Sequence, residues 1–113
     1  MYNKNDSGTP NENTKSIPII PKIKVSNLTS SRSGREVANQ FEIATADGVY
    51  FQSYSSIIAF IPRNSNEFKI MLDANNWDYS VTTSKYRTQF LGYNTKEVKE
   101  KIKSGEYILA DLN

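Results

Sequence analysis

The chain has 113 residues, of which 37% are hydrophobic and 23% are charged, and its formal net charge is +2. It contains neither cysteine nor histidine, which excludes disulfides, thiol nucleophiles and the commonest metal ligands and removes the usual general base of enzymes. No apolar run approaches the roughly 20 residues that cross a bilayer, and the first residues lack the apolar core of a signal peptide. We therefore expect a non-enzymatic cytoplasmic protein with no cofactor, no metal and no membrane segment.

The N-terminal stretch differs in composition from the rest of the chain. Residues 1–16 are almost entirely polar and are predicted to be disordered, because they cannot bury enough apolar surface to offset the entropy of ordering. Residues 17–22 have the sequence Ile-Pro-Ile-Ile-Pro-Lys. Proline fixes φ and lacks an N–H donor, which predicts an extended edge segment or an arm laid on a surface or on a partner. We assign residues 1–22 to a tail and arm, and residues 23–113 to a single domain.

A β-hairpin is predicted in the middle of the chain. Apolar and polar residues alternate over residues 41–45 and again over 49–52, with Ala46-Asp47-Gly48 between them. A two-residue loop after Ala46 would mix the apolar and polar faces, so we predict a three-residue loop with Gly48 in the left-handed region, which pairs Ile43 with Phe51. Three polar or aromatic residues are then expected on the opposite face: Tyr50, Gln52 and Tyr54.

Further strand segments are expected around this hairpin. Alternating residues from Ile23 to Leu28 predict the first strand of the sheet. The apolar run over residues 57–61 predicts a central strand buried on both faces. Alternation over residues 68–72 predicts another strand, and the apolar residues 107–109 predict a short last one.

Two helices are expected after these strands. Ser80 is a suitable N-cap for the first, Gly92 is placed to end it, and a buried stripe is predicted at Thr82, Tyr86 and Phe90. The second has Asn94 and Glu97 in capping-box spacing, a buried stripe at Val98 and Ile102, and Gly105 at its end. Its charges predict the i,i+4 pairs Lys96–Glu100 and Glu97–Lys101. The whole pattern predicts an α+β fold with a small antiparallel sheet of four to five strands and two short helices packed on one face.

The charges and aromatic residues of the helical region suggest a binding surface. Residues 81–105 carry six basic and two acidic side chains, and several aromatic residues lie close to them in sequence. Aromatic rings among lysines and arginines can stack on bases and neutralise phosphates. The alternatives are that these rings belong to the core and that the charges form a solvated helix surface. Likewise, the hydroxyl groups at the start of the first helix either cap it or meet an anion.

Two motifs resemble a known family. They combine an "SY…IA" strand with a "YS-x-TTS" helix start, and the matching residues here are Asn39-Gln40-Phe41, Gly48 to Tyr54, Ile58-Ala59, Trp77 to Tyr86 and Phe90-Leu91. The chain is similar over about residues 36–113 to short proteins of unknown function that phages, plasmids and related elements encode. The resemblance implies an accessory role in a host cytoplasm, but it transfers no catalytic residue.

Three hypotheses for the function follow. The first is a non-enzymatic accessory protein of a phage or mobile element that binds nucleic acid. The second is a protein-directed inhibitor of a host defence or replication enzyme, and the third is a small-ligand or nucleotide binder at the hydroxyl-rich helix start. The candidate partner-binding residues are Tyr50, Gln52, Tyr54, Trp77, Tyr79, Thr82, Thr83, Ser84, Lys85, Arg87, Lys99 and Lys103.

Overall fold

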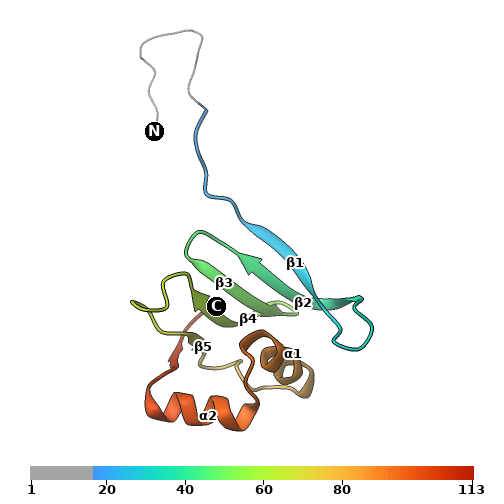
Figure 1. Ribbon diagram of the computed structural model, residues 1–113, viewed down its shortest axis with the longest axis vertical. Coiled ribbons are helices and arrows are strands. Elements are labelled where there is room, and N and C mark those ends of the chain that lie inside the picture. Colours follow the sequence, from blue (N-terminus) through green and yellow to red (C-terminus); the bar gives the residue numbers. More distant parts are fainter. Residues whose placement is uncertain (1–16) are drawn as a thin grey trace.

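The computed structural model describes residues 17–113, so the predicted disorder of residues 1–16 lies outside the described residues. The described part contains six strands and two helices (Figure 1). Their bounds are β1 Lys24–Thr29, β2 Glu36–Ala44, β3 Gly48–Ser53, β4 Ser56–Pro62, β5 Met71–Asp73, α1 Val81–Leu91, α2 Thr95–Ser104 and β6 Ile108–Ala110.

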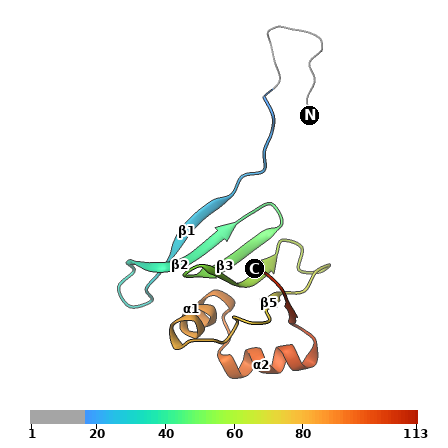
Figure 2. The ribbon, with the colours of Figure 1, turned by 180° about the vertical axis from the view of Figure 1, so that it is seen from behind.

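The strands form one sheet in the order β1-β2-β3-β4-β5-β6. The pairs from β1 to β5 are antiparallel, whereas β6 lies parallel to β5. Both helices lie on the same side of the sheet, as the two opposite views show (Figures 1 and 2). The α+β prediction is therefore confirmed, although the sheet has six strands. The extra pairing arises because the chain returns to the sheet beside β5 after the helices.

The predicted three-residue loop of the β2–β3 hairpin is wrong. Ala44 pairs with Val49, and the N–H of Thr45 donates to the carbonyl of Gly48 at 2.8 Å, which leaves only Ala46 and Asp47 in the loop. Gly48 is the first residue of β3 and has a φ of +150°, which residues other than glycine rarely adopt. A Cβ on Gly48 would lie 2.3 Å from the carbonyl oxygen of Ile61. The glycine is thus used for close contact with β4 and not for a left-handed turn.

The observed register also changes which residues share a face. Glu42 pairs with Phe51, and Phe41 pairs with Gln52, so neighbouring residues of β2 point to the faces opposite to those predicted. A shift of one residue in register exchanges the two faces of a strand. Phe51 faces the helices, where its ring stacks on that of Phe90 at 5.6 Å. Phe41 therefore lies on the face away from the helices, together with Tyr50 and Gln52.

Two strand predictions need correction beyond the hairpin. The run 57–61 is an inner strand, but it is not buried throughout: Ile58 and Ala59, at a bulge opposite β3, are fully buried, whereas Phe60 is half-buried. The predicted strand over residues 68–72 is shortened to β5, and Phe68 is 53% exposed. Hydrogen bonds from Glu67 and Phe68 to the Asn64 carbonyl close a turn in this region, and the turn occupies the backbone that a longer strand would use.

The predicted caps of both helices are confirmed. The Ser80 hydroxyl accepts from the Thr83 N–H at 3.1 Å at the start of α1, and Gly92 ends that helix with a φ of +84°. In α2, Asn94 and Glu97 form the predicted capping box, with bonds of 2.8 and 2.9 Å, and Gly105 ends the helix. Each cap depends on residues within four positions of one another, which is why the sequence pattern reveals it.

The buried stripe of α1 contains the predicted Tyr86 and Phe90 but not the predicted Thr82. Thr82 is exposed, whereas Thr83, Tyr86 and Arg87 are buried and Phe90 packs against the core. Positions 83, 86, 87 and 90 fall on one side of a helix with 3.6 residues per turn. The predicted α2 stripe is present, because Val98 is fully buried and Ile102 packs against the core.

The core lies between the sheet and the two helices. Its buried apolar members come from β1, β3, β4, β5, both helices and the segment before β6, and they are Leu28, Phe51, Ile58, Ala59, Leu72, Tyr86, Val98 and Tyr107. At roughly 25 cal/mol per Å² of apolar surface removed from water, a layer of this kind is the main source of stability. The core holds the helices on one side and leaves the other face of the sheet without a helical layer.

Asp73 joins β5 to the C-terminal segment. Its carboxylate is 1% exposed and accepts hydrogen bonds from the backbone N–H groups of Leu112, Asn75 and Asn76 at 2.9, 3.2 and 3.0 Å. Burial alone would raise the pKa of Asp73, but hydrogen bonds from the Leu112 N–H, the Asn76 side chain and the Asn75 N–H help to outweigh it and hold the pKa below its ordinary value. The ionised carboxylate therefore fixes both the turn before Trp77 and the end of the chain.

Replacing Gly48 with alanine should destabilise the fold by about 2–3 kcal/mol, because the new methyl group would overlap β4. Gly34→Ala is the matched control. Gly34 also has a positive φ, of +74°, but no atom lies within 4 Å of its Cβ position, so the expected cost is about 1 kcal/mol. Urea unfolding measures both variants. Equal losses of stability would contradict the close packing of Gly48 on β4.

Asp73→Asn should lower the free energy of unfolding at pH 7 by about 1–2 kcal/mol. Because the folded pKa of Asp73 lies below the unfolded value, its contribution is complete above about pH 3.9 and is lost as the pH falls through the folded pKa. The difference between the wild type and the variant should therefore shrink below about pH 4. Urea unfolding between pH 7 and pH 2.5 measures it, with the exposed Asp47→Asn as the control. A difference that stays constant with pH would contradict the assigned role.

Candidate binding surfaces

An uncharged surface covers the side of the sheet that the helices leave open. We define this open sheet face by six of the residues that the pairing of β1, β2, β3 and β4 places on one side, where Asn27 also lies opposite Phe41: Val25, Phe41, Ile43, Tyr50, Gln52 and Phe60. None of them carries a charge, and four strands contribute to it. Tyr50 and Phe60 form its centre, with ring centroids 4.5 Å apart. Val25, near the edge of the sheet, is 61% exposed.

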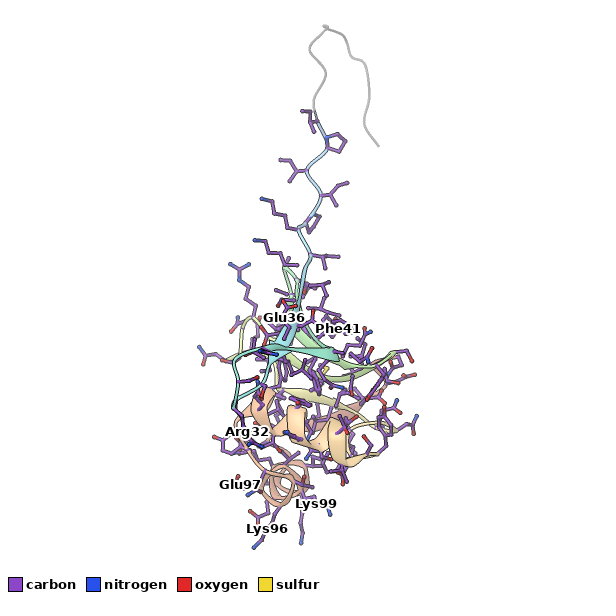
Figure 3. The ribbon with its side chains drawn as sticks, turned by 90° about the vertical axis from the view of Figure 1, so that its right-hand side faces the viewer. Arg32, Glu36, Phe41, Lys96, Glu97 and Lys99 are labelled. Atoms are coloured by element: carbon purple, nitrogen blue, oxygen red, sulfur yellow. The ribbon has the colours of Figure 1, made fainter. Side chains whose placement is uncertain are left out.

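The helices and the open sheet face lie at opposite ends of the molecule. Viewed from the side, Phe41 is on the part of the sheet remote from the helices, whereas Lys96 and Lys99 project from the far side of α2 (Figure 3). The lysines of α2 are therefore separated from the aromatic residues of the sheet by the whole core. An arrangement in which these lysines and rings share one surface is not formed.

The hydroxyl groups at the start of α1 are mostly engaged within the protein. Thr83 is fully buried, and its hydroxyl hydrogen-bonds that of Ser53 at 2.9 Å. The Ser84 hydroxyl donates to Asp78 at 2.9 Å, and Thr82 is exposed. These contacts favour capping over anion binding, the second of the two alternatives for this motif.

Arg87 belongs to the interior. Its side chain is fully buried, and its guanidinium donates to the Trp77 carbonyl at 2.6 Å, to Asp78 at 3.4 Å and to the hydroxyl of Thr95. The same group lies over the Trp77 ring, 5.0 Å from its centroid. Burial lowers the pKa of Arg87 from its ordinary value, and the hydrogen bond and charge of Asp78 act against this. As predicted contacts for a partner, Thr83 and Arg87 are corrected: they are unavailable because the fold encloses them.

The lysines do not converge on one place. Lys85, Lys99 and Lys103 are exposed on two different helices. Lys101 pairs with Glu106 at 3.0 Å, and no i,i+4 ion pair to Glu97 forms within the described residues. The Glu106 hydrogen bond raises the pKa of Lys101 above its ordinary value, against a smaller effect of desolvation.

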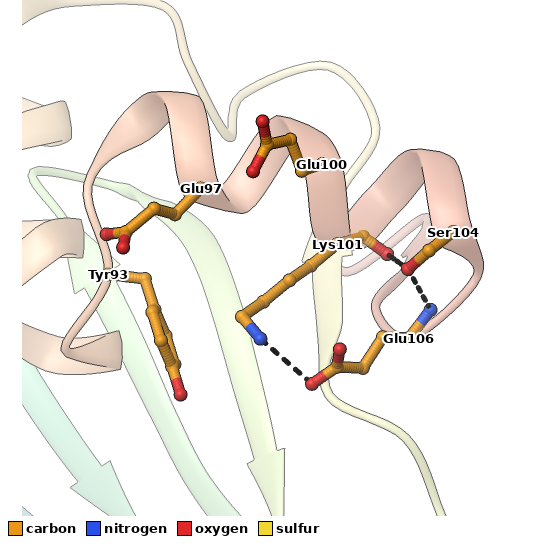
Figure 4. A pocket seen from close by; sticks show the side chains of 6 residues that line it. All are labelled: Tyr93, Glu97, Glu100, Lys101, Ser104 and Glu106. Atoms are coloured by element: carbon orange, nitrogen blue, oxygen red, sulfur yellow. Dashed lines mark hydrogen bonds and ion pairs between the residues drawn. The ribbon is translucent and has the colours of Figure 1, made fainter.

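A shallow hollow of about 340 Å³ lies beside α2. It is lined by Tyr93, Glu97, Glu100, Lys101, Ser104 and Glu106 (Figure 4). The ammonium group of Lys101 extends into it, 4.2 Å from the centroid of the Tyr93 ring. Because the chain's own cation occupies the position between the tyrosine and the glutamate, the hollow is a poor site for a positively charged ligand.

The remaining aromatic candidates are dispersed. Tyr54 is 50% exposed in the β3–β4 turn, where it has a φ of +57°. Tyr79 is 49% exposed just before α1, and Trp77 packs against the core. Of the predicted partner-binding residues, the structure therefore brings only Tyr50 and Gln52 together on one surface. Phe41, Ile43 and Phe60 belong to this surface and were not predicted, because their face depends on the register.

The burial of Gln40 is a second feature that the sequence pattern does not predict. It is fully buried on the helix side of β2, and within residues 17–113 neither its amide oxygen nor its amide nitrogen has a hydrogen-bond partner. An unpaired buried amide costs on the order of 1–3 kcal/mol. The apolar residues Phe41 and Ile43 point outward from the same strand. The strand thus buries a polar side chain fully and leaves two apolar ones half-buried on its outer face.

The comparisons with known proteins place the chain in a family. A family model described as "Family of unknown function (DUF8033)" matches residues 23–106. The chain belongs to this family. No curated protein and no solved structure matches it. All six residues of the open sheet face lie within the DUF8033 match, whereas residues 17–22 precede it.

Among residues 17–113, no helix combines the length and the apolar character of a membrane span. No group of three or more acidic side chains within the same residues is arranged to hold a metal ion.

Arg87→Met should destabilise the protein by about 3 kcal/mol, because Asp78 and the Trp77 carbonyl would lose their buried partner. Lys85→Met, on the exposed side of the same helix, should change stability by no more than about 0.5 kcal/mol. Urea unfolding of the two variants distinguishes the roles. A stable Arg87→Met protein would show that the guanidinium does not serve the fold.

Proposed function

We propose that the chain is a non-enzymatic accessory protein that binds another protein through the open sheet face. One observation carries this proposal: four neighbouring strands present an uncharged aromatic and aliphatic surface that the helices do not cover. This corresponds to the second hypothesis drawn from the sequence, a protein-directed binder.

The composition of the face supports a protein partner. An antiparallel sheet with one solvated face normally alternates apolar residues inside with polar residues outside. Here the outer positions of β2 are Phe41 and Ile43, and those of β3 and β4 include Tyr50 and Phe60. Contiguous apolar surface rimmed by polar residues is typical of interaction sites, and aromatic residues supply most of the binding energy in protein interfaces.

Nucleic acid is less well supported. Rings on an open sheet can stack on bases, but affinity for nucleic acid comes largely from lysines and arginines that neutralise phosphates. Lys99 and Lys103 lie on α2, behind the opposite face of the sheet, and Arg87 is enclosed. The third hypothesis, a nucleotide at the start of α1, is weakened because Thr83 and Ser84 are engaged by Ser53 and Asp78.

The setting is part of the same proposal. The motifs around Tyr50 and Ser80 resemble those of short proteins from phages and mobile elements, which supports a partner in the host cell. We therefore propose a host protein, such as a defence or replication enzyme, as the partner. The proposed contact requires no catalytic activity of this chain, only a rigid apolar surface that the partner binds.

The test compares a face variant with a helix variant of the full chain. Tyr50→Glu combined with Val25→Glu places two charges on the open sheet face, and Lys99→Ala combined with Lys103→Ala removes two charges from α2. Proteins captured from the host lysate by the wild type should be retained by the helix variant. Their capture by the face variant should fall at least about tenfold, because desolvating an unpaired charge in an interface costs more than 1.4 kcal/mol.

Fluorescence anisotropy with labelled single- and double-stranded DNA and RNA provides the second measurement. At about 50 and 200 mM salt we expect no salt-sensitive binding, since phosphate contacts would weaken steeply over this range. Salt-sensitive binding that the helix variant loses and the face variant keeps would replace the proposal with a nucleic-acid function. Circular dichroism of each variant verifies that it is folded.

A further inference from the structure

A second uncharged surface lies in the arm, which we define as residues 17–23. Its four isoleucines are among the most exposed apolar residues of the described chain: Ile17, Ile19, Ile20 and Ile23 are 86%, 97%, 77% and 67% exposed. The only charge in the arm is Lys22, next to its junction with β1. Exposed apolar side chains in this number, side by side in sequence, indicate that the arm has a binding partner.

The arm cannot readily bury its isoleucines by folding back onto its own domain. Pro18 and Pro21 fix their own φ angles and hold the residues before them in extended conformations. The arm continues directly into β1 without a turn and extends away from the sheet (Figures 1 and 2). The segment that leaves the edge strand therefore does not lie on its own open sheet face.

The arm and the open sheet face are complementary in chemistry and in size. Isoleucines and prolines in an extended conformation are bound by aromatic-lined surfaces, because little conformational entropy remains to be lost. Seven residues in this conformation span roughly 20 Å. Four neighbouring strands, separated by about 4.8 Å each, are about 14 Å across. The arm is thus long enough to cross β1, β2, β3 and β4 over the Tyr50–Phe60 pair.

We propose that two copies of the chain exchange arms, so that the arm of each copy lies on the open sheet face of the other. This inference rests on the proposed function in treating that face as a binding surface, and it names a second copy as an occupant. Two-fold symmetry makes both contacts identical and closes the assembly at a dimer. The arm then competes with any other protein for the same face, so the partner of the proposed function must displace it.

The mass of the full chain in solution tests the exchange first. Sedimentation equilibrium should give twice the 12.8 kDa chain mass for the wild type. Ile19→Ser combined with Ile20→Ser, at exposed positions that leave the fold intact, should raise the dimer dissociation constant at least tenfold. Val25→Glu on the open sheet face should do the same. Lys99→Ala combined with Lys103→Ala should remain dimeric. A wild type that is monomeric up to about 200 μM, or a dimer that both of the first two variants preserve, would overturn the proposal.

Cross-linking tests where the arm lies. The natural chain has no cysteine, so any disulfide must join the introduced residues. A mixture of an Ile19→Cys chain with a Gln52→Cys chain should form a covalent heterodimer on mild oxidation. A mixture of the same Ile19→Cys chain with a Lys99→Cys chain should not exceed the background of random collisions. Equal yields in the two mixtures would overturn the proposed position of the arm.

The outcomes separate this inference from the proposed function. A monomeric wild type whose Tyr50→Glu/Val25→Glu variant loses a captured host protein would refute arm exchange and leave the proposed function standing. A dimer that depends on the arm, together with host-protein capture that the face variant leaves unchanged, would support exchange and refute the proposed function. If both hold, Ile19→Ser/Ile20→Ser should increase capture of the host protein, because the face is then free.

Discussion

The buried guanidinium of Arg87 is the interaction on which the arrangement of the helices depends. It connects the Trp77 carbonyl and Asp78 in the segment after β5 to Thr95 at the first turn of α2, while its own backbone belongs to α1. A charge taken out of water is tolerated only when such partners surround it. One side chain therefore sets the position of three segments relative to one another. This explains how α1 packs well although its buried side carries Thr83 and Arg87 beside Tyr86 and Phe90.

Local signals in the sequence predict the two helices. The strand register is not predicted, because it depends on contacts between residues that are far apart in the chain. The caps at Ser80 and Asn94 and the terminal glycines each involve residues a few positions apart, so they can be recognised from the sequence alone. The register of the β2–β3 hairpin instead depends on how closely Gly48 approaches Ile61 in β4. An Ala-Asp-Gly sequence is compatible with more than one loop, and the contact with a third strand selects between them.

The candidate site was only partly predictable for the same reason. Tyr50 and Gln52 were assigned to the correct face because β3 alternates clearly, but Phe41 and Ile43 were assigned to the core. The apolar run in β4 was equally ambiguous, since a hydrophobic residue in sequence is compatible with a core and with an interface. Arg87 shows the converse error. A basic residue among aromatic ones suggested a nucleic-acid contact, and its burial became visible only when Trp77, Asp78 and Thr95 were placed around it.

The sheet has two faces that differ in what covers them but not in being apolar. The face toward the helices buries Phe51 and the unpaired amide of Gln40, whereas the other face leaves Phe41, Ile43 and Phe60 half-buried. Reversing β2 by one register step would bury the two apolar side chains and expose the glutamine, which would suit an isolated domain better. The observed register of β2 instead buries the glutamine and leaves the two apolar side chains on the outer face. A binding partner on the open sheet face removes that apparent cost, because the half-buried apolar residues are then fully buried in the complex.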